Sequence, residues 1–185
     1  AYMDTKRRGE LEALRFYREE GLPVVVVNPT TFFGAGDING NEFSIFEQIN
    51  KGSAFFRRAF PGKTSVLAID DAVLGHIVAM EKGKLGERYI LSSEHLSMRE
   101  LMDCIAGSLE RPLTEGVWSR ATGLLMYLGA SAAESSYDTF RIKSLPPIAR
   151  HEVSIGFGYR QFSSKKARKE LDWEPKVDFQ QAVND

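Results

Sequence analysis

Excess charge of one sign, cysteine and long apolar runs are all scarce in this sequence, and each absence excludes a class of protein. In 185 residues, 24 Lys and Arg stand against 25 Asp and Glu, giving a formal net charge of −1. This balance argues against nucleic acid or an anionic membrane surface as the main partner. No apolar run approaches the ~20 residues that cross a bilayer, so we expect no membrane span.

Cysteine and histidine offer little chemistry. Cys104 is the single cysteine, which excludes an internal disulfide and favours the reducing cytoplasm as location. It falls in an apolar stretch and is expected to be a buried core residue. His76, His95 and His151 have no second ligand at helical spacing, so we assign no metal.

The chain opens on a tyrosine and a lysine four residues apart. It starts with Ala1 and reads as the middle of a helix with no capping residue ahead, so we expect its natural beginning to be missing. On a helix, Tyr2 and Lys6 share one face about 6 Å apart along the axis. A phenol has a pKa of about 10, and a fixed cation nearby favours the phenolate. Tyr2 is therefore a candidate acid/base group, although a tyrosine packed along a lysine on a solvated helix gives the same pattern.

A helix over residues 2–20 is predicted to end at Gly21 and lead into a buried strand. The run Val24-Val25-Val26-Val27 has no polar alternation, which is typical of a parallel strand covered on both faces. Pro29 should end this strand because it lacks an N–H. Ligands of open α/β sheets bind at the carboxyl ends of strands, where Asn28, Thr30 and Thr31 stand, although an ordinary loop fits equally.

The rest of the chain alternates between helical and strand patterns, which predicts an α/β fold. The expected helices cover residues 42–51, 72–83, 97–109, 118–140 and 163–173, and the expected extended segments are 63–69, 86–91 and 153–162. Asp70 and Asp71 are interpreted as helix caps rather than a metal or glycosidic pair. Ser97 and Glu100 have the spacing of a capping box.

A basic and aromatic patch follows the helix expected over residues 42–51. Arg57 and Arg58 flank Phe55, Phe56 and Phe60. The patch could hold an anionic or flat substrate, or the aromatic rings could simply pack the loop down.

The order of these motifs resembles the carboxyl-terminal half of the extended short-chain dehydrogenase/reductase family, the NAD(P)-dependent epimerase/dehydratase group. The matching passages are Tyr2-Met3-Asp4-Thr5-Lys6, the run from Gly21 to Thr31 with Gly34 and Gly36-Asp37, Ile69-Asp70-Asp71-Ala72 with Gly75-His76, Gly86 to Leu91, and Ser164 to Pro175. Within the group, Asn-Pro-Thr and Gly-Glu-Arg-Tyr-Ile-Leu look most like dihydroflavonol-reductase-like proteins and hopanoid-associated sugar epimerases.

This resemblance implies an architecture. Residues 1–30 and about 64–92 would complete a Rossmann-like doubly wound parallel sheet, while about 31–63 and 93–185 would form most of a smaller mixed α/β substrate-binding region. The family's Gly-rich phosphate loop and its catalytic Ser or Thr would lie upstream of this sequence. The chain alone is therefore expected to bind dinucleotide poorly and to be nearly inactive.

The resemblance also implies a cofactor and site residues. Tyr2 would be the catalytic acid/base, and Lys6 would hold the nicotinamide ribose and lower the pKa of Tyr2. Pro29 and Thr30 would line the nicotinamide of NAD or NADP, with Asn28, Thr31 and Phe32 nearer a small-molecule substrate. In the family, the helix with the Tyr and Lys often joins a dimer interface, so a homodimer is possible by analogy.

Three functions stay open at this point. The leading hypothesis is an oxidoreductase that moves hydride between nicotinamide and a secondary alcohol or ketone. The second is a nucleotide-sugar epimerase or dehydratase, in which Arg57, Arg58 or Arg88 would meet a diphosphate. The third is a non-catalytic binding or assembly module that retains the fold without the chemistry.

Overall fold

The computed structural model describes residues 2–35, 45–113, 116–140, 142 and 150–184. The chain forms two compact units. Unit 1 contains residues 1–35, 66–94 and 162–182, and unit 2 contains residues 36–65, 95–161 and 183–185. Each unit is described separately below.

Unit 1 begins with a long helix followed by a parallel strand pair. The predicted first helix is α1 (Tyr2–Glu20), and Gly21, with φ +71, makes the turn at its end. Strand β1 (Val26–Pro29) pairs in parallel with β4 (Arg88–Leu91), in a register that sets Val26 beside Arg88 and Pro29 beside Leu91. As predicted, β1 ends at Pro29, although the residues of β1 are only half-buried.

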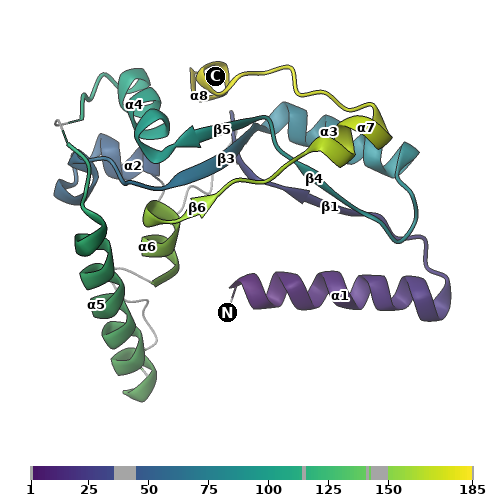
Figure 1. Cartoon of the computed structure of the whole chain (residues 1–185), viewed down its shortest axis with the longest axis horizontal. Coiled ribbons are helices and arrows are strands. Elements are labelled where there is room, and N and C mark those ends of the chain that lie inside the picture. The colour runs from purple at the N-terminus through teal and green to yellow at the C-terminus, as the bar shows by residue number, and fades with distance from the viewer. Residues whose placement is uncertain (1, 36–44, 114–115, 141, 143–149, 185) are drawn as a thin grey trace. The chain divides into compact units, whose positions relative to one another are not determined.

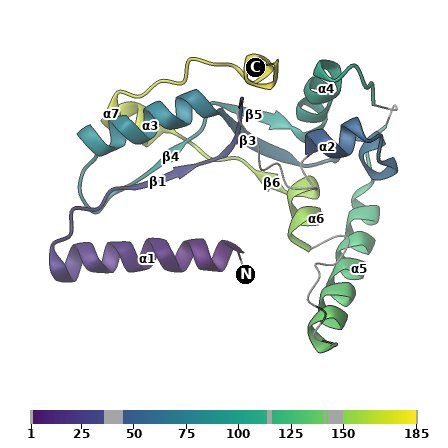
Figure 2. The ribbon, with the colours of Figure 1, turned by 180° about the vertical axis from the view of Figure 1, so that it is seen from behind.

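One face of the β1–β4 pair carries the core of unit 1. Helices α3 (Ile69–Lys82) and α7 (Lys165–Leu171) lie on this face, opposite α1 (Figures 1 and 2). The buried cluster consists of Leu67, Ala72, Ala79, Tyr89, Leu91, Ala167, Leu171 and Trp173, with Val25, Val27 and Val78 packed against it. Gly75 of α3 allows this close packing, since a Cβ there would stand 2.3 Å from Leu91 Cδ1. Apolar burial on this scale is the main source of stability for the unit.

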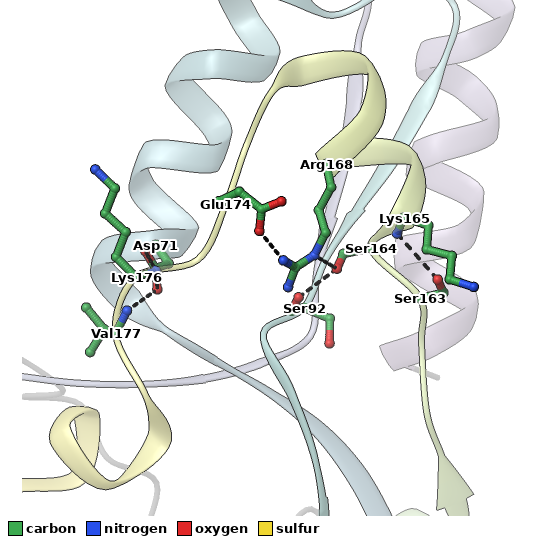
Figure 3. A network of polar contacts seen from close by, with 9 residues as sticks. All are labelled: Asp71, Ser92, Ser163, Ser164, Lys165, Arg168, Glu174, Lys176 and Val177. Atoms are coloured by element: carbon green, nitrogen blue, oxygen red, sulfur yellow. Dashed lines mark hydrogen bonds and ion pairs between the residues drawn. The ribbon is translucent and has the colours of Figure 1, made fainter.

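Polar contacts hold the carboxyl-terminal segment of unit 1 against the rest of that unit (Figure 3). The buried Asp71 carboxylate accepts hydrogen bonds from the backbone N–H groups of Lys176 and Val177 at 2.9–3.0 Å. The Ser164 hydroxyl donates to the carbonyl oxygen of Ser92 at 2.8 Å. Asp71 thus anchors the tail instead of capping α3, whose N-cap is Ala68, so the predicted cap was wrong.

A second sheet has the strand order β2-β3-β5, with β6 also paired to β3. Its strands are β2 (Thr31–Phe33), β3 (Lys63–Ala68), β5 (Glu94–Ser97) and β6 (Tyr159–Arg160). In unit 1, β2 pairs in parallel with the end of β3, setting Thr31 beside Val66. In unit 2, the start of β3 pairs with β6. β2 replaces the loop expected after Pro29.

Helices make up most of unit 2. They are α2 (Ile45–Asn50), the 3-10 turn η1 (Ala54–Arg57), α4 (Met98–Ser108), α5 (Arg120–Thr139) and α6 (Arg150–Phe157). α8 (Phe179–Asn184) is the last helix of the chain, and its residues up to Ala182 belong to unit 1. The capping box of Ser97 and Glu100 at the start of α4 is confirmed.

One segment of unit 2 differs from its expected structure, and one cannot be compared. The segment 153–162 was expected to be extended, yet its first half belongs to helix α6, and the two-residue strand β6 follows. The Gly-rich cluster 36–41 lies outside the described residues. Across the described ranges, no helix is long and apolar enough to cross a bilayer.

Candidate active site at the carboxyl end of β1

A carboxylate on α1 ties this helix to the second face of the β1–β4 pair. Glu10 accepts a hydrogen bond from the Asn28 side-chain amide at 3.3 Å and forms an ion pair with Arg88 at 3.0 Å. The Glu10 side chain is 21% exposed, so the pair is partly shielded from water. At the other end of α1, the Tyr17 ring lies against Gly86, where an added Cβ would come within 2.3 Å of it. These contacts fix which side of α1 faces the strands.

The two residues predicted to be catalytic occupy backbone positions of α1 that are in step with Glu10. Tyr2, Lys6 and Glu10 are spaced by four residues and therefore share a helix face. The turn after Gly21 sends β1 back along α1, so the amino end of the helix lies toward the carboxyl end of the strand (Figures 1 and 2). Each step of four residues is about 6 Å along a helix. The backbone positions of Lys6 and Tyr2 therefore lie about 6 Å and about 12 Å further along the helix axis than Glu10. This displacement runs toward the carboxyl end of β1.

Two buried hydroxyl groups stand at the carboxyl ends of the paired strands. Thr30 follows β1, and its N–H donates to the Leu91 carbonyl at 2.9 Å, which extends the register so that Thr30 lies beside Ser92. Because Tyr89 and Leu91 belong to the α3 face, strand alternation places Ser92, like Arg88, on the α1 face. Among the described residues, Thr30 Oγ1 and Ser92 Oγ have no hydrogen-bond partner.

Unpaired buried hydroxyls of this kind are uncommon and call for an explanation. A buried group without a partner costs about 1–3 kcal/mol. Ser92 was not among the residues expected at the site. Its position directly after a strand, at the edge where ligands of α/β sheets bind, was the available signal in the sequence.

The remaining predicted residues separate into two groups. Asn28 and Pro29 end β1, and Asn28 is the one held by Glu10. Thr31 and Phe32 belong to β2, which pairs with β3 and not with β1, and both are exposed. The structure thus places Asn28 and Thr30 on the α1 face of the first sheet, while Thr31 and Phe32 extend the second sheet.

The arginines considered for a diphosphate are held by protein contacts. Arg88 pairs with Glu10, and the Arg58 guanidinium lies over the Trp118 ring at 5.6 Å. Arg57 lines a hollow of about 360 Å³ in unit 2, together with Phe56, Arg111 and neighbours.

The aromatic patch of this region is a packed cluster. Phe55 lies 5.0 Å from Phe60 and 6.1 Å from Trp118 between ring centroids, and Phe60 lies 5.6 Å from Phe157. The rings therefore pack the segment down, as one of the two interpretations predicted.

A second ion pair of unit 1 lies at the amino end of β4. The Lys166 ammonium donates a hydrogen bond to the Glu87 carboxylate at 2.5 Å and lies 4.7 Å from the Tyr89 ring centroid. This hydrogen bond lowers the pKa of Glu87 and raises that of Lys166. In the described part of the chain, no group of three or more His, Cys, Asp and Glu could hold a metal ion.

A parallel strand pair with helices on both faces, and a polar helix face at its carboxyl edge, defines a Rossmann-like α/β protein.

Comparison with curated proteins points to the same group. A putative dihydroflavonol 4-reductase from Synechocystis is 34% identical over 110 residues, 55% of this chain and 30% of that protein. Tetraketide alpha-pyrone reductase 2 from Arabidopsis thaliana is 35% identical over 105 residues, 55% of this chain and 32% of that protein. No family model matches the chain.

Solved structures match nearly the whole chain. The protein gox2253 has 28% identity and a TM-score of 0.73, covering 100% of this chain and 54% of its own. PA4631, a nucleoside-diphosphate-sugar epimerase from Pseudomonas aeruginosa, has 26% identity and a TM-score of 0.69, covering 96% and 51%.

Two more distant structures, a dTDP-glucose 4,6-dehydratase from Bacillus anthracis with NAD and RMD from Pseudomonas aeruginosa with NADPH, have 16% and 14% identity and TM-scores of 0.60 and 0.61. They cover 95% of this chain and 47% and 50% of their own, and they share its fold.

These matches confirm the predicted resemblance to reductases and epimerases of the extended short-chain type, including the dihydroflavonol-reductase-like proteins. The predicted Rossmann-like α/β class is confirmed with it. The chain spans about a third of the length of these curated relatives and about half that of the solved structures.

Proposed function

We propose that this chain is the carboxyl-terminal portion of an NAD(P)-dependent oxidoreductase that transfers hydride between nicotinamide and a secondary alcohol or ketone. Tyr2 gives a proton to the carbonyl oxygen in reduction and takes it back in oxidation. Lys6 binds the ribose hydroxyls of the cofactor and provides the positive charge next to Tyr2. The enzyme acts on a small molecule in the cytoplasm.

The observation that carries this proposal is the double contact of Glu10 with Asn28 and Arg88. This contact orients α1, and the spacing of four residues supports a position of Lys6 and Tyr2 toward the end of β1. A proton donor must come within hydrogen-bond reach of the reacting oxygen, so the orientation of α1 is a requirement for the chemistry. The similarity to two proteins named as reductases supports the reaction class.

The residues at this edge fit a nicotinamide dinucleotide. Thr30 offers a hydroxyl without a protein partner among the described residues, at the strand end where α/β proteins bind ligands. Tyr2, Lys6, Pro29 and Thr30 would hold the cofactor, and Asn28, Thr31 and Phe32 would contact the substrate. When bound, the nicotinamide supplies or accepts the hydride.

The rest of the dinucleotide site belongs, in this proposal, to an amino-terminal half that carries the phosphate-binding loop. Among the described residues, β1 pairs with β4 alone, which leaves its second edge open to a further parallel strand. The 185-residue chain by itself is therefore expected to bind dinucleotide weakly and to show almost no turnover.

The decisive experiment replaces the phenol in the full-length protein. Tyr2→Phe is expected to reduce kcat by at least about 100-fold, since general acid catalysis contributes about 10²–10⁴ in rate. The dissociation constant for NAD(P)H should change little. Lys6→Ala should weaken both turnover and dinucleotide binding, because the ammonium contacts the ribose.

Steady-state kinetics and cofactor fluorescence titration give the two readouts. Arg8→Ala is a matched control, because Arg8 is an exposed cation on α1 outside the spacing of four from Tyr2. Unchanged turnover in Tyr2→Phe, or equal losses in Arg8→Ala and Lys6→Ala, would contradict the assignment.

A second candidate reaction is epimerisation or dehydration of a nucleotide sugar. The observation in its favour is the match to PA4631, a nucleoside-diphosphate-sugar epimerase. Against it, Arg88 and Arg58 already have protein contacts. NAD retained through purification of the full-length protein, together with turnover of a nucleoside-diphosphate sugar, would favour this reaction over simple reduction.

A further inference from the structure

The Ser92 hydroxyl is an exception among the buried polar groups of the described chain. Ser92 is 1% exposed, and among the described residues its Oγ has no hydrogen-bond partner. The other buried polar residues that the structure describes all form side-chain hydrogen bonds: Thr64, Ser65, Asp71 and Ser164. A buried hydroxyl without a protein partner lowers stability, and a ligand that supplies the missing hydrogen bond explains its presence.

A second hydroxyl of this kind stands next to Ser92. Thr30 lies beside it across the two strand ends, on the same α1 face, and its Oγ1 also has no partner in the described part of the chain. Neighbouring parallel strands are about 4.8 Å apart, whereas an O–H···O hydrogen bond is about 2.8 Å long. This spacing explains why the two hydroxyls do not bond to each other, and it suits a small group that bonds to both.

The chemistry of the pair selects a neutral group. Hydroxyls carry no charge, and each can both donate and accept a hydrogen bond. On the α1 face, Glu10 and Arg88 pair with each other, and the proposed function assigns the Lys6 ammonium to the ribose. A buried phosphate or carboxylate would need a charged partner of its own. A primary amide is neutral, with an accepting oxygen and a donating nitrogen, so each hydroxyl can bond to one of them.

Burial limits the size of the group that can enter. Ser92 is enclosed, while Thr30 is half-buried and directly follows the last residue of β1. Access to Ser92 therefore runs past Thr30, whose side chain can change its rotamer. A terminal group of few atoms fits such an entrance better than a ring does.

The order of the strands indicates which end of a ligand reaches Ser92. Among the described residues, β1 pairs with β4 alone, and its second edge is open. In the proposed function, this open edge receives the amino-terminal half with the phosphate-binding loop. A dinucleotide that extends from there meets Thr30 after β1 first and Ser92 after β4 second. Ser92 then contacts the end of the nicotinamide that lies farthest from the phosphates.

We propose that Ser92 and Thr30 together bind the carboxamide of the nicotinamide ring. One hydroxyl donates to the amide oxygen, and the other accepts from the amide nitrogen. These two hydrogen bonds fix the rotation of the ring about its bond to the ribose, and thereby the ring face that is turned toward the substrate. The inference rests on the proposed function and adds to it a cofactor-binding residue on a second strand.

Calorimetric titration of the full-length protein with NAD and NADP tests the contact without using turnover. For the dinucleotide that binds more tightly, Ser92→Ala should raise the dissociation constant about 3- to 10-fold, the effect of losing one hydrogen bond between neutral groups. Thr30→Val removes the second hydroxyl with little change in side-chain volume and should have a similar effect. Ser93→Ala is the matched control and should leave binding unchanged, because the Ser93 hydroxyl already donates to the Val66 carbonyl.

Two cofactor analogues separate a direct contact from a general change in structure. The 3-acetylpyridine analogue lacks the amide nitrogen, and the thionicotinamide analogue has sulfur in place of the amide oxygen. If Ser92 binds the amide, the loss of affinity in Ser92→Ala should disappear with at least one of the two analogues. An equal loss for the natural cofactor and both analogues, or no loss for any of them, would overturn the inference.

The same variants separate this inference from the proposed function. An unchanged cofactor dissociation constant with a raised substrate KM in Ser92→Ala would assign the hydroxyl to the substrate, against the inference. If the wild-type full-length protein binds neither dinucleotide, the proposed function and the inference fail together. If it binds one, and Tyr2→Phe loses turnover as expected while Ser92 shows no coupling to the amide, the inference fails alone.

Discussion

The two faces of the β1–β4 pair differ in composition and in what they do. The face under α3 and α7 consists of fully buried apolar groups such as Leu91 and Trp173. On the face under α1, Asn28 and Arg88 form a polar network with Glu10 of α1, and the Ser92 hydroxyl has no partner among the described residues. The first face stabilises the unit through apolar burial. The second face positions polar groups at the strand ends, and its unpaired buried hydroxyl lowers the stability of the unit. Four variants test this difference.

The largest effect is expected from neighbouring residues of β4 that point to opposite faces. Leu91→Ala removes a side chain with 0% exposure from the α3 face and should lower the free energy of unfolding by about 2–5 kcal/mol. Ile90→Ala on the α1 face is the matched control and should cost clearly less. Urea unfolding followed by Trp173 fluorescence in a Trp118→Phe background reports on unit 1. Equal losses would mean that the two faces contribute alike.

A moderate effect is expected from the contact that orients α1. Glu10→Ala removes the partner of Asn28 and Arg88 and should cost about 1 kcal/mol in the same unfolding experiment, because the network is only partly buried. In the full-length protein it should reduce kcat/KM by more than this loss of stability explains. Glu12→Ala is the control, since Glu12 pairs with Arg15 on the same helix. Full activity in Glu10→Ala would separate the network from the site.

A smaller change in the unfolding free energy is expected from Ser92, the residue after β4. In contrast to Leu91→Ala, its replacement should not destabilise unit 1. Ser92→Ala removes a buried polar atom that has no partner in the described part of the chain, so the unfolding free energy should stay within about 0.5 kcal/mol or rise. Ser164→Ala is the control, because its hydroxyl donates to the Ser92 carbonyl and its loss should destabilise. A large loss in Ser92→Ala would show that the hydroxyl is satisfied by a bound water.

The smallest effect concerns the exposed pair of Glu87 and Lys166. The hydrogen bond from Lys166 lowers the pKa of Glu87 in the folded chain. A lowered carboxyl pKa contributes stability above the unfolded pKa of about 4.5, and this stability is lost as the pH falls through the folded value. Glu87→Gln should therefore flatten slightly the acid side of the stability profile and leave pH 7 to 9 nearly unchanged. An unaltered profile at low salt would show that the pair is fully screened.

Long elements with a strong pattern could be predicted from the sequence. α1, α3, α4 and α5 were expected close to their observed bounds, because helical periodicity and stop signals are local properties. Segment 153–162 was predicted incorrectly, since its few residues carry a weak pattern that packing around Phe157 decides. Short strands such as β2 and β5 form through pairing with β3, which is distant from both in sequence.

In the candidate site, too, some residues could be suggested from the sequence and others could not. The sequence suggested Tyr2, Lys6, Pro29 and Thr30 from spacing and resemblance, and their roles stay predictions. It could not indicate that Glu10 orients α1, because both partners of Glu10 are distant in the chain. Nor could it indicate that Asp71 anchors the tail, since an acid in the first turn of a helix is first expected to cap it.

The sequence by itself determined the family resemblance, the α/β class and the positions of the long helices, because these follow from residue order and from periodicity within one segment. Tertiary structure alone decided which face of each strand is apolar, which partner Asp71 takes, and that a hydroxyl after β4 stands next to one after β1. The physical reason is that burial and hydrogen bonding depend on distances between segments that are far apart along the chain.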